Sequence, residues 1–190
     1  MCKAILQGQK IVTLEAYGFS PMFCKMIWNC ISSASFSVLV EGSPTPPFKS
    51  QRGIRQGDPL SPILFDMIMD VLGRLIQREV KNKIIYTYQV NGATFISHLM
   101  YANDIFIFSK TNPKSLNAIK AMFEKFSLFS GLEVNASKSS STFSKVRAED
   151  QSLHDILGYI VKNLSITHLG LPITGKKKSF GVWTVLESEN

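Results

Sequence analysis

Residues 60–76 constrain the fold most, because apolar side chains recur there at the spacing of one helical face. These apolar residues are Leu60, Ile63, Leu64, Met67, Ile68, Val71, Leu72, Leu75 and Ile76. Asp66, Asp70 and Arg74 mostly occupy the other side. Asp58 stands where a helix cap is needed, and Pro59 suits the first helical position. The pattern predicts a long amphipathic helix with one face in a core.

Two further helices and several strands are expected around it. Ser20 and Pro21 begin a packing helix with an apolar stripe, and Asn112-Pro113 begin another that ends before Gly131. The first stripe consists of Phe23, Met26, Ile27, Cys30 and Ile31, and the second of Leu116, Ile119, Met122, Phe123 and Phe126.

Alternating or β-branched residues predict strands in the segments between these helices. A strand over residues 36–40 is broken by the turn-forming run 42–47, and the strand over 84–90 ends at Asn91-Gly92. Strands over 94–102 and 105–108 flank a tip at Asn103-Asp104, and weaker strands are expected over 132–135 and 166–173. Helices and antiparallel hairpins interleave, so the fold class is α+β, an antiparallel sheet with helices packed on one face.

Composition narrows the setting of the chain. Apolar residues make up 45% of its 190 residues, which argues for one globular unit with a substantial core. Twenty-one Lys and Arg against 14 Asp and Glu give a net charge of +7, which favours a polyanionic partner such as nucleic acid. Three irregularly spaced cysteines form no disulfide or zinc pattern, and no run is long enough for a signal peptide or membrane span. An intracellular protein is therefore expected, with nucleus and cytoplasm both open.

Four segments in a fixed order carry the chemistry. They are Arg52–Pro62 (RGIRQGDPLSP), His98–Ser109 (HLMYANDIFIFS), Phe129–Ser139 (FSGLEVNASKS) and His168–Pro172 (HLGLP). This succession resembles the later motifs of reverse transcriptases of non-LTR retrotransposons, the LINE-like kind abundant in plant genomes. The resemblance covers roughly residues 17–175. It implies a palm-like fold, RNA-directed DNA polymerase activity, and an RNA template and DNA primer as partners.

The resemblance implies a metal-dependent catalytic hairpin. In the family its tip reads aromatic-Ala-Asp-Asp, and with a third, upstream aspartate it seats two Mg²⁺ or Mn²⁺ ions. Here Asn103 replaces the first of the pair, and its amide brings no negative charge. Asp104 retains the second position and is the expected metal ligand. No Asp or Glu precedes Glu15, so the upstream carboxylate is unaccounted for.

Other site residues carry over from the family motifs. Arg52, Arg55, Gln56 and Gly57 match the loop that approaches the incoming nucleotide and template, and Lys138 matches a lysine that assists the pyrophosphate leaving group. Leu169, Gly170 and Leu171 match the segment that holds the primer. Each also has a plainer interpretation, as a surface charge, a turn residue or a core residue.

The resemblance divides the chain into an upstream remnant at 1–16, a palm-like core at 17–145, and a palm end with the start of a thumb-like region at 146–190. It predicts a truncated domain whose polymerase activity is impaired or absent, with Mg²⁺ or Mn²⁺ as cofactor only if activity remains. Two alternatives stay open: a non-catalytic nucleic-acid-binding module and a functionless retroelement relic.

Overall fold

The computed structural model describes the backbone of residues 9–49, 57–90, 94–143, 155–162, 165–168, 171–174 and 182–187. The chain forms two compact units. The first comprises Met1–Phe65 and Phe126–Leu132, and the second comprises Asp66–Lys125 and Glu133–Asn190.

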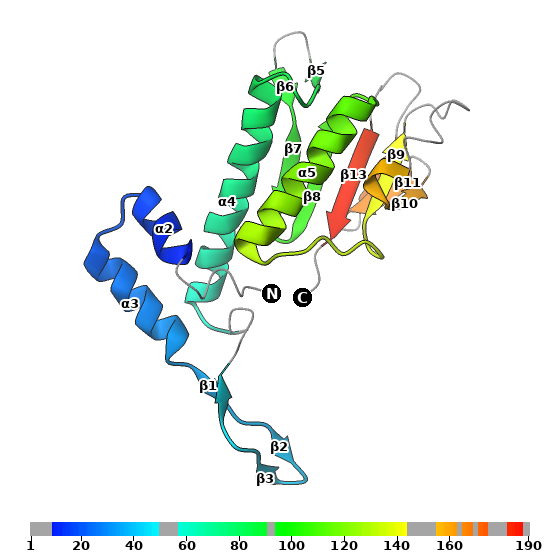
Figure 1. The fold of residues 1–190 in the computed structure, drawn as a ribbon. Coiled ribbons are helices and arrows are strands. Elements are labelled where there is room, and N and C mark those ends of the chain that lie inside the picture. The colour runs from blue at the N-terminus through cyan, green and yellow to red at the C-terminus, as the bar shows by residue number, and fades with distance from the viewer. Residues whose placement is uncertain are drawn as a thin grey trace. The chain divides into compact units, whose positions relative to one another are not determined.

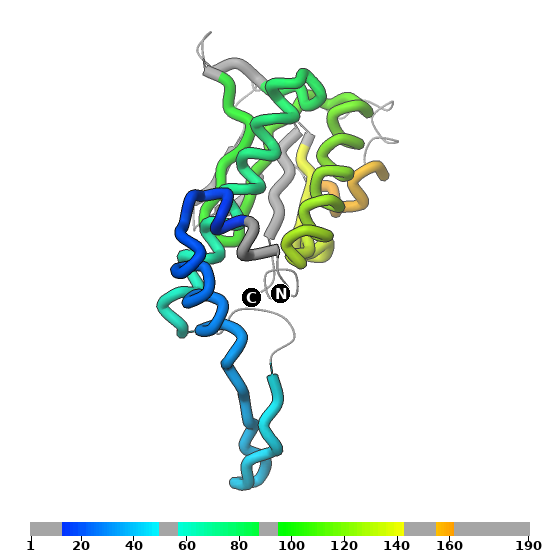
Figure 2. Tube along the Cα trace, turned by 60° about the vertical axis from the view of Figure 1, so that its left-hand side comes forward, coloured from blue at the N-terminus to red at the C-terminus, as the bar shows by residue number. Residues whose placement is uncertain are grey.

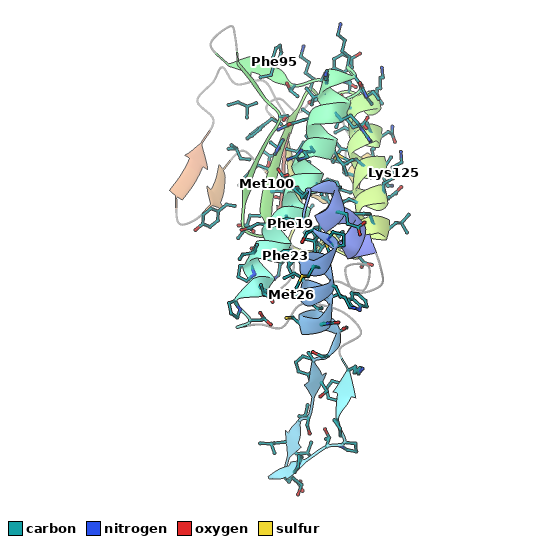
Figure 3. The ribbon with its side chains drawn as sticks, turned by 90° about the vertical axis from the view of Figure 1, so that its left-hand side faces the viewer. Phe19, Phe23, Met26, Phe95, Met100 and Lys125 are labelled. Atoms are coloured by element: carbon teal, nitrogen blue, oxygen red, sulfur yellow. The ribbon has the colours of Figure 1, made fainter. Side chains whose placement is uncertain are left out.

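The first unit contains helices α2 (Gln9–Ala16) and α3 (Pro21–Ser32). Ser20 caps α3 as predicted, since its Oγ accepts a hydrogen bond of 3.3 Å from the Phe23 amide. The predicted packing stripe is wrong in part: Ile27 is buried, but Met26 is 56% exposed. Apolar residues surround most of this helix, so periodicity alone could not select its buried face. Figure 3 labels Met26 on the same helix as Phe23, whose ring stacks on that of Phe19 at a centroid distance of 4.9 Å.

A narrow β-arm follows α3 along the chain (Figure 2). Its strands are β1 (Ser35–Phe36), β2 (Leu39–Val40), β3 (Ser43–Pro44) and β4 (Phe48–Lys49), with β1 paired to β4 and β2 paired to β3. Glu41 and Gly42 connect β2 to β3 with positive φ angles of 49° and 81°. Positive φ at both loop residues gives the twist that a two-residue hairpin requires. The predicted hairpin is confirmed, although its strands are shorter than expected.

Helix α4 (Leu60–Lys81) matches the long helix predicted from the sequence. Asp58 caps it by accepting a hydrogen bond of 2.9 Å from the Leu60 amide. The buried positions of its stripe are Leu64, Ile68, Leu72 and Ile76, whereas Ile63 is exposed. A regular apolar stripe buried along its length explains why this helix could be placed from sequence.

Helix α5 (Pro113–Ser130) also ends where the sequence indicated. Asn112 Oδ1 accepts a hydrogen bond of 2.8 Å from the Ser115 amide at the start of the helix, and Gly131 follows its end with a φ of 71°. Its buried side chains include Leu116, Ile119, Met122, Phe123 and Phe126, the five that the sequence placed on one face. Before α5, β5 (Tyr88–Val90) pairs with β6 (Thr94–Ile96), and the predicted turn at Asn91-Gly92 lies outside the described residues.

A five-stranded sheet forms the centre of the second unit. Its strands, β7 (His98–Tyr101), β8 (Asp104–Ser109), β9 (Ser140–Phe143), β10 (Ile160–Lys162) and β13 (Val182–Glu187), lie in the order β10-β9-β13-β8-β7. All pairs are antiparallel except β10 with β9. Figure 1 shows α4 and α5 across the same face of this sheet. The fold is a mixed arrangement of helices and mainly antiparallel strands, as predicted, but the parallel pair was not expected.

Two strand predictions near the C-terminal part were wrong. No strand forms over 132–135, and β9 begins instead at Ser140. Residues 166–173 form no single strand, because β11 (Ser165–His168) and β12 (Leu171–Thr174) fold back on each other as an antiparallel pair. A chain reversal at Leu169-Gly170 satisfies the backbone polar groups locally, which an isolated strand could not do. Within the described part of the chain, no helix has the length and apolar character needed to cross a membrane.

Candidate active site

The β7–β8 hairpin presents Asn103 and Asp104 at one end of the five-stranded sheet. Tyr101 pairs with Asp104, so the connecting loop consists of Ala102 and Asn103. The predicted tip at Asn103-Asp104 is therefore wrong by one residue, because Asp104 is the first residue of β8. A two-residue loop is the shortest common hairpin connection, and the Tyr101–Asp104 pair allows it. Ala102 takes a φ of 49°, while Asn103 and Asp104 are half-buried.

The strands behind this loop are held firmly in the core. Ile105, Phe106 and Ile107 of β8 are between 0% and 4% exposed. On β7, the His98 ring lies so near α4 that a Cβ added at Gly73 would stand 3.2 Å from His98 Nε2. A hairpin anchored in this way keeps the Asp104 carboxyl group at a fixed place at the sheet end, which a metal or phosphate site requires.

Burial also sets the protonation of His98. Desolvation lowers the pKa of its imidazole below the ordinary value of 6.5, because burial disfavours the charged form. The Ser97 hydroxyl lies 2.9 Å from His98 Nδ1, close enough for a hydrogen bond. His98 therefore supports the hairpin as a mainly neutral side chain at pH 7.

Lys138 lies in a tight turn between α5 and β9. Asn135 Oδ1 accepts hydrogen bonds from the amides of Ser137 at 3.0 Å and Lys138 at 3.2 Å, which bends the backbone where a strand had been expected. Because Lys138 precedes Ser140 by two residues, this turn lies at the end of β9. Its side chain is exposed.

Strand register places this turn and the hairpin at the same end of the sheet. Ser140, Val185 and Phe106 form one row across β9, β13 and β8. Two residues beyond each lie Lys138, Glu187 and Asp104. The structure thus brings two predicted site residues, Lys138 and Asp104, to one sheet end through a strand that the sequence did not predict.

The other predicted site residues are not assembled by the described structure. Arg52, Arg55, Gln56, Leu169 and Gly170 lie outside the described residues. Their predicted roles remain predictions.

Two members of the same motifs are described. Gly57 is exposed before α4 with a φ of 82°, a conformation that favours glycine. Leu171 pairs with His168 in the β11–β12 hairpin. Gly57 belongs to the first unit, whereas Asp104 and Leu171 belong to the second.

Sequence reasoning missed Glu187 and the strand that carries it. The segment Val-Trp-Thr-Val-Leu-Glu at 182–187 is rich in β-branched and aromatic residues, which favour strands. That composition could have predicted β13. It could not have predicted that β13 pairs with β8 and faces Asp104 with Glu187.

The donor set of the hairpin was tested against a divalent cation. Asp104 offers carboxylate oxygens and Asn103 an amide oxygen, the hard donors that Mg²⁺ and Mn²⁺ accept. In the part of the chain that is described, no group of three His, Cys, Asp or Glu side chains could hold a metal ion. The donors suit such a cation in kind, but the hairpin itself brings only one negative charge. A bound Mg²⁺ would neutralise phosphate oxygens and polarise them for attack.

A palm-like mixed α/β fold with an aromatic-Ala-x-Asp hairpin at one sheet end defines a class of nucleotidyl-transferring domains. Residues 5–173 match the family described as reverse transcriptase (RNA-dependent DNA polymerase). This chain belongs to that family. Members of the family generally use Mg²⁺ or Mn²⁺ and bind an RNA template and a DNA primer.

Curated relatives include proteins of mobile elements. The chain is 32% identical over 126 residues to the Pol polyprotein of the type-2 retrotransposable element R2DM of Drosophila melanogaster, covering 66% of this chain and 11% of that protein. It is 27% identical over 130 residues to the transposon TX1 149 kDa protein of Xenopus laevis, covering 68% of this chain and 10% of that protein. The predicted resemblance to non-LTR retrotransposon reverse transcriptases is confirmed. The chain spans only about a tenth of the length of these two relatives.

A shorter relative occurs in a plant. The uncharacterized mitochondrial protein AtMg01250 of Arabidopsis thaliana is 33% identical over 98 residues, which cover 51% of this chain and 80% of that protein.

Proposed function

We propose that this chain is a reverse transcriptase domain whose RNA-directed DNA polymerase activity is absent or severely reduced. The observation that carries the proposal is the β7–β8 hairpin, where Asn103 stands in the loop and Asp104 starts β8. Two-metal nucleotidyl transfer needs several carboxylates around both ions. The Asn103 amide can coordinate a cation but cannot offset its charge.

The loss should be large, because residues that act as one catalytic unit lose most of their effect when one member is removed. Lys138 at the same sheet end can still neutralise phosphate charge, and the half-buried Asp104 can still offer its carboxylate. These remnants support binding of a nucleotide or primer end more readily than catalysis.

Primer extension tests the proposal directly. The full chain would be incubated with an RNA template, an annealed DNA primer, the four deoxynucleotides, and Mg²⁺ or Mn²⁺. We expect no extension above background, while a reverse transcriptase of demonstrated activity extends the same primer. Robust synthesis that disappears in Asp104→Asn would show that the site is competent and would refute the proposal.

Net charge favours a second function, which is binding of nucleic acid without catalysis. The chain carries +7, and Arg52 and Arg55 belong to the matched family region. Phosphate contacts by such residues give affinity that falls steeply with salt. In a gel shift with an RNA–DNA duplex at low salt, Arg52→Ala with Arg55→Ala should weaken binding, whereas Lys25→Ala on α3 should not. Absence of any shift at low salt would exclude this function.

A further inference from the structure

The C-terminal strand β13 fills a central position in the five-stranded sheet. Six consecutive residue pairs join it antiparallel to β8, and four join it to β9. The last of the six pairs places Glu187 directly opposite Asp104. A carboxylate-bearing residue from the far end of the chain therefore stands beside the catalytic hairpin of the family.

Register fixes how near the two positions are. Residues directly opposite in an antiparallel pair lie on the same face of the sheet, with Cβ atoms about 4.5–5.5 Å apart. Tyr101 extends the same row on the other side of Asp104, in β7. Carboxyl groups at positions 104 and 187 are thus within the span over which two protein ligands can share one metal ion.

Electrostatics gives this pair a consequence. Like charges directly opposite each other in a sheet destabilise it, so a Glu–Asp pair needs compensation. A divalent cation supplies it, since two carboxylates balance its charge. Mg²⁺ is commonly bound by one or two carboxylates and keeps several of its waters. The amide oxygen of Asn103, next to Asp104, adds a neutral donor of the same hard type.

We propose that Glu187, held opposite Asp104 by strand pairing, supplies the second carboxylate of a seat for one Mg²⁺ or Mn²⁺ ion at the β7–β8 hairpin. The residue comes from the C-terminal strand, not from the upstream segment where the family resemblance places the third ligand. The inference rests on the proposed function only in that it concerns the same hairpin. A seat for one ion does not restore two-metal catalysis, so metal binding and weak polymerisation are compatible.

Mn²⁺ binding measured by electron paramagnetic resonance tests the proposal without reference to activity. The full chain is titrated with Mn²⁺, and Mg²⁺ is then added to displace it. Glu187→Gln and Asp104→Asn should each weaken the hairpin site by about tenfold or more, because losing even an outer-shell partner of a metal ligand typically costs about 10- to 100-fold. Asn103→Asp should strengthen the site by adding a charge.

Control variants separate a direct ligand from a general charge effect. Glu15→Gln removes the same charge from α2, outside the sheet, and should leave Mn²⁺ affinity unchanged. Glu187→Asp keeps the carboxylate and should bind more tightly than Glu187→Gln. Melting curves of each variant, with and without Mg²⁺, show whether it folds, and Mg²⁺ should raise the melting temperature of the original chain more than that of Glu187→Gln.

Equal Mn²⁺ affinity in the original chain and a folded Glu187→Gln variant would overturn the proposal. Unchanged Mn²⁺ affinity together with a lower melting temperature in both Glu187→Gln and Lys138→Ala would also overturn it, since Glu187 would then pair with the lysine at that sheet end. Robust primer extension would contradict the proposed function instead, so the two failures are distinguishable.

Discussion

At the scale of single residues, the hairpin combines a chemical substitution with a backbone conformation unfavourable to its side chain. Ala102 adopts a φ of 49°, although the left-handed region costs an L-residue roughly 1–2 kcal/mol. Asn103 follows it in the loop and lacks the charge that the family has there. The residue types could be read from the sequence, but the strained conformation of Ala102 could not.

Replacing Ala102 by Gly should stabilise the protein. Glycine removes the Cβ penalty at positive φ but gives the unfolded chain more freedom, so the expected net gain in the free energy of unfolding is about 0.5–1 kcal/mol. Urea denaturation followed by circular dichroism measures it. Ala136→Gly is the matched control, since Ala136 lies in an exposed turn without a positive φ, and it should give no gain. A loss of stability in Ala102→Gly would contradict the strain argument.

His98 should make stability depend on pH. Burial lowers its folded-state pKa below the ordinary 6.5, so the unfolded chain binds the proton more readily. The contribution is therefore fully present above pH 6.5 and is lost as pH falls below it. The free energy of unfolding should drop more between pH 7.5 and pH 5 in the original chain than in His98→Gln, by less than about 1.4 kcal/mol per pH unit. Parallel pH profiles for the two proteins would show that His98 does not contribute.

At the scale of elements, helices were predicted better than strands. The stripe and caps of α4 and α5 are local signals, and both helices begin and end close to the predicted residues. The helix α3 shows the limit, because its apolar residues surround it and its neighbours decide which side is buried. Strands 132–135 and 166–173 failed because hydrogen bonds from Asn135 and a local reversal replaced them.

One long-range hydrogen bond ties α5 to the segment before β5. The Ser115 hydroxyl, fully buried, accepts from the Tyr86 amide at 3.1 Å and donates to the Ile84 carbonyl at 3.5 Å. Ser115→Ala leaves that amide without this partner, which should cost about 1–3 kcal/mol of unfolding free energy. Denaturant titration checks this loss. Asn117→Ala, on the exposed side of the same helix, should cost less, and equal losses would show that the buried bond has no special weight.

At the scale of the whole molecule, the second unit depends on a strand from the end of the chain. β13 lies between β8 and β9, so it completes a sheet whose other strands come from much earlier residues. Pairing of this kind has a high entropic cost, because a long intervening chain must close before the contacts form. It also brings Glu187 to the hairpin that identifies the family.

A proline in β13 tests this arrangement. Thr184 pairs with Ile107 on one side and Ser141 on the other, so proline would remove a ladder hydrogen bond in a central strand. Thr184→Pro should lower the free energy of unfolding by at least ~2 kcal/mol, whereas Thr184→Val keeps the amide and should change it little. Thermal denaturation compares the two variants. Equal melting temperatures would mean that β13 does not stabilise the sheet.

The sequence by itself determined the family, the long helix α4 and the aromatic-Ala-Asn-Asp hairpin, because ordered motifs, helical periodicity and turn chemistry are local. Only the tertiary structure decided that Asp104 starts β8, which face of α3 is buried, and that Lys138 and Glu187 share a sheet end with Asp104. Strand pairing joins residues far apart in sequence, and no local pattern specifies its register. The carboxylate expected upstream has its nearest counterpart at the opposite end of the chain.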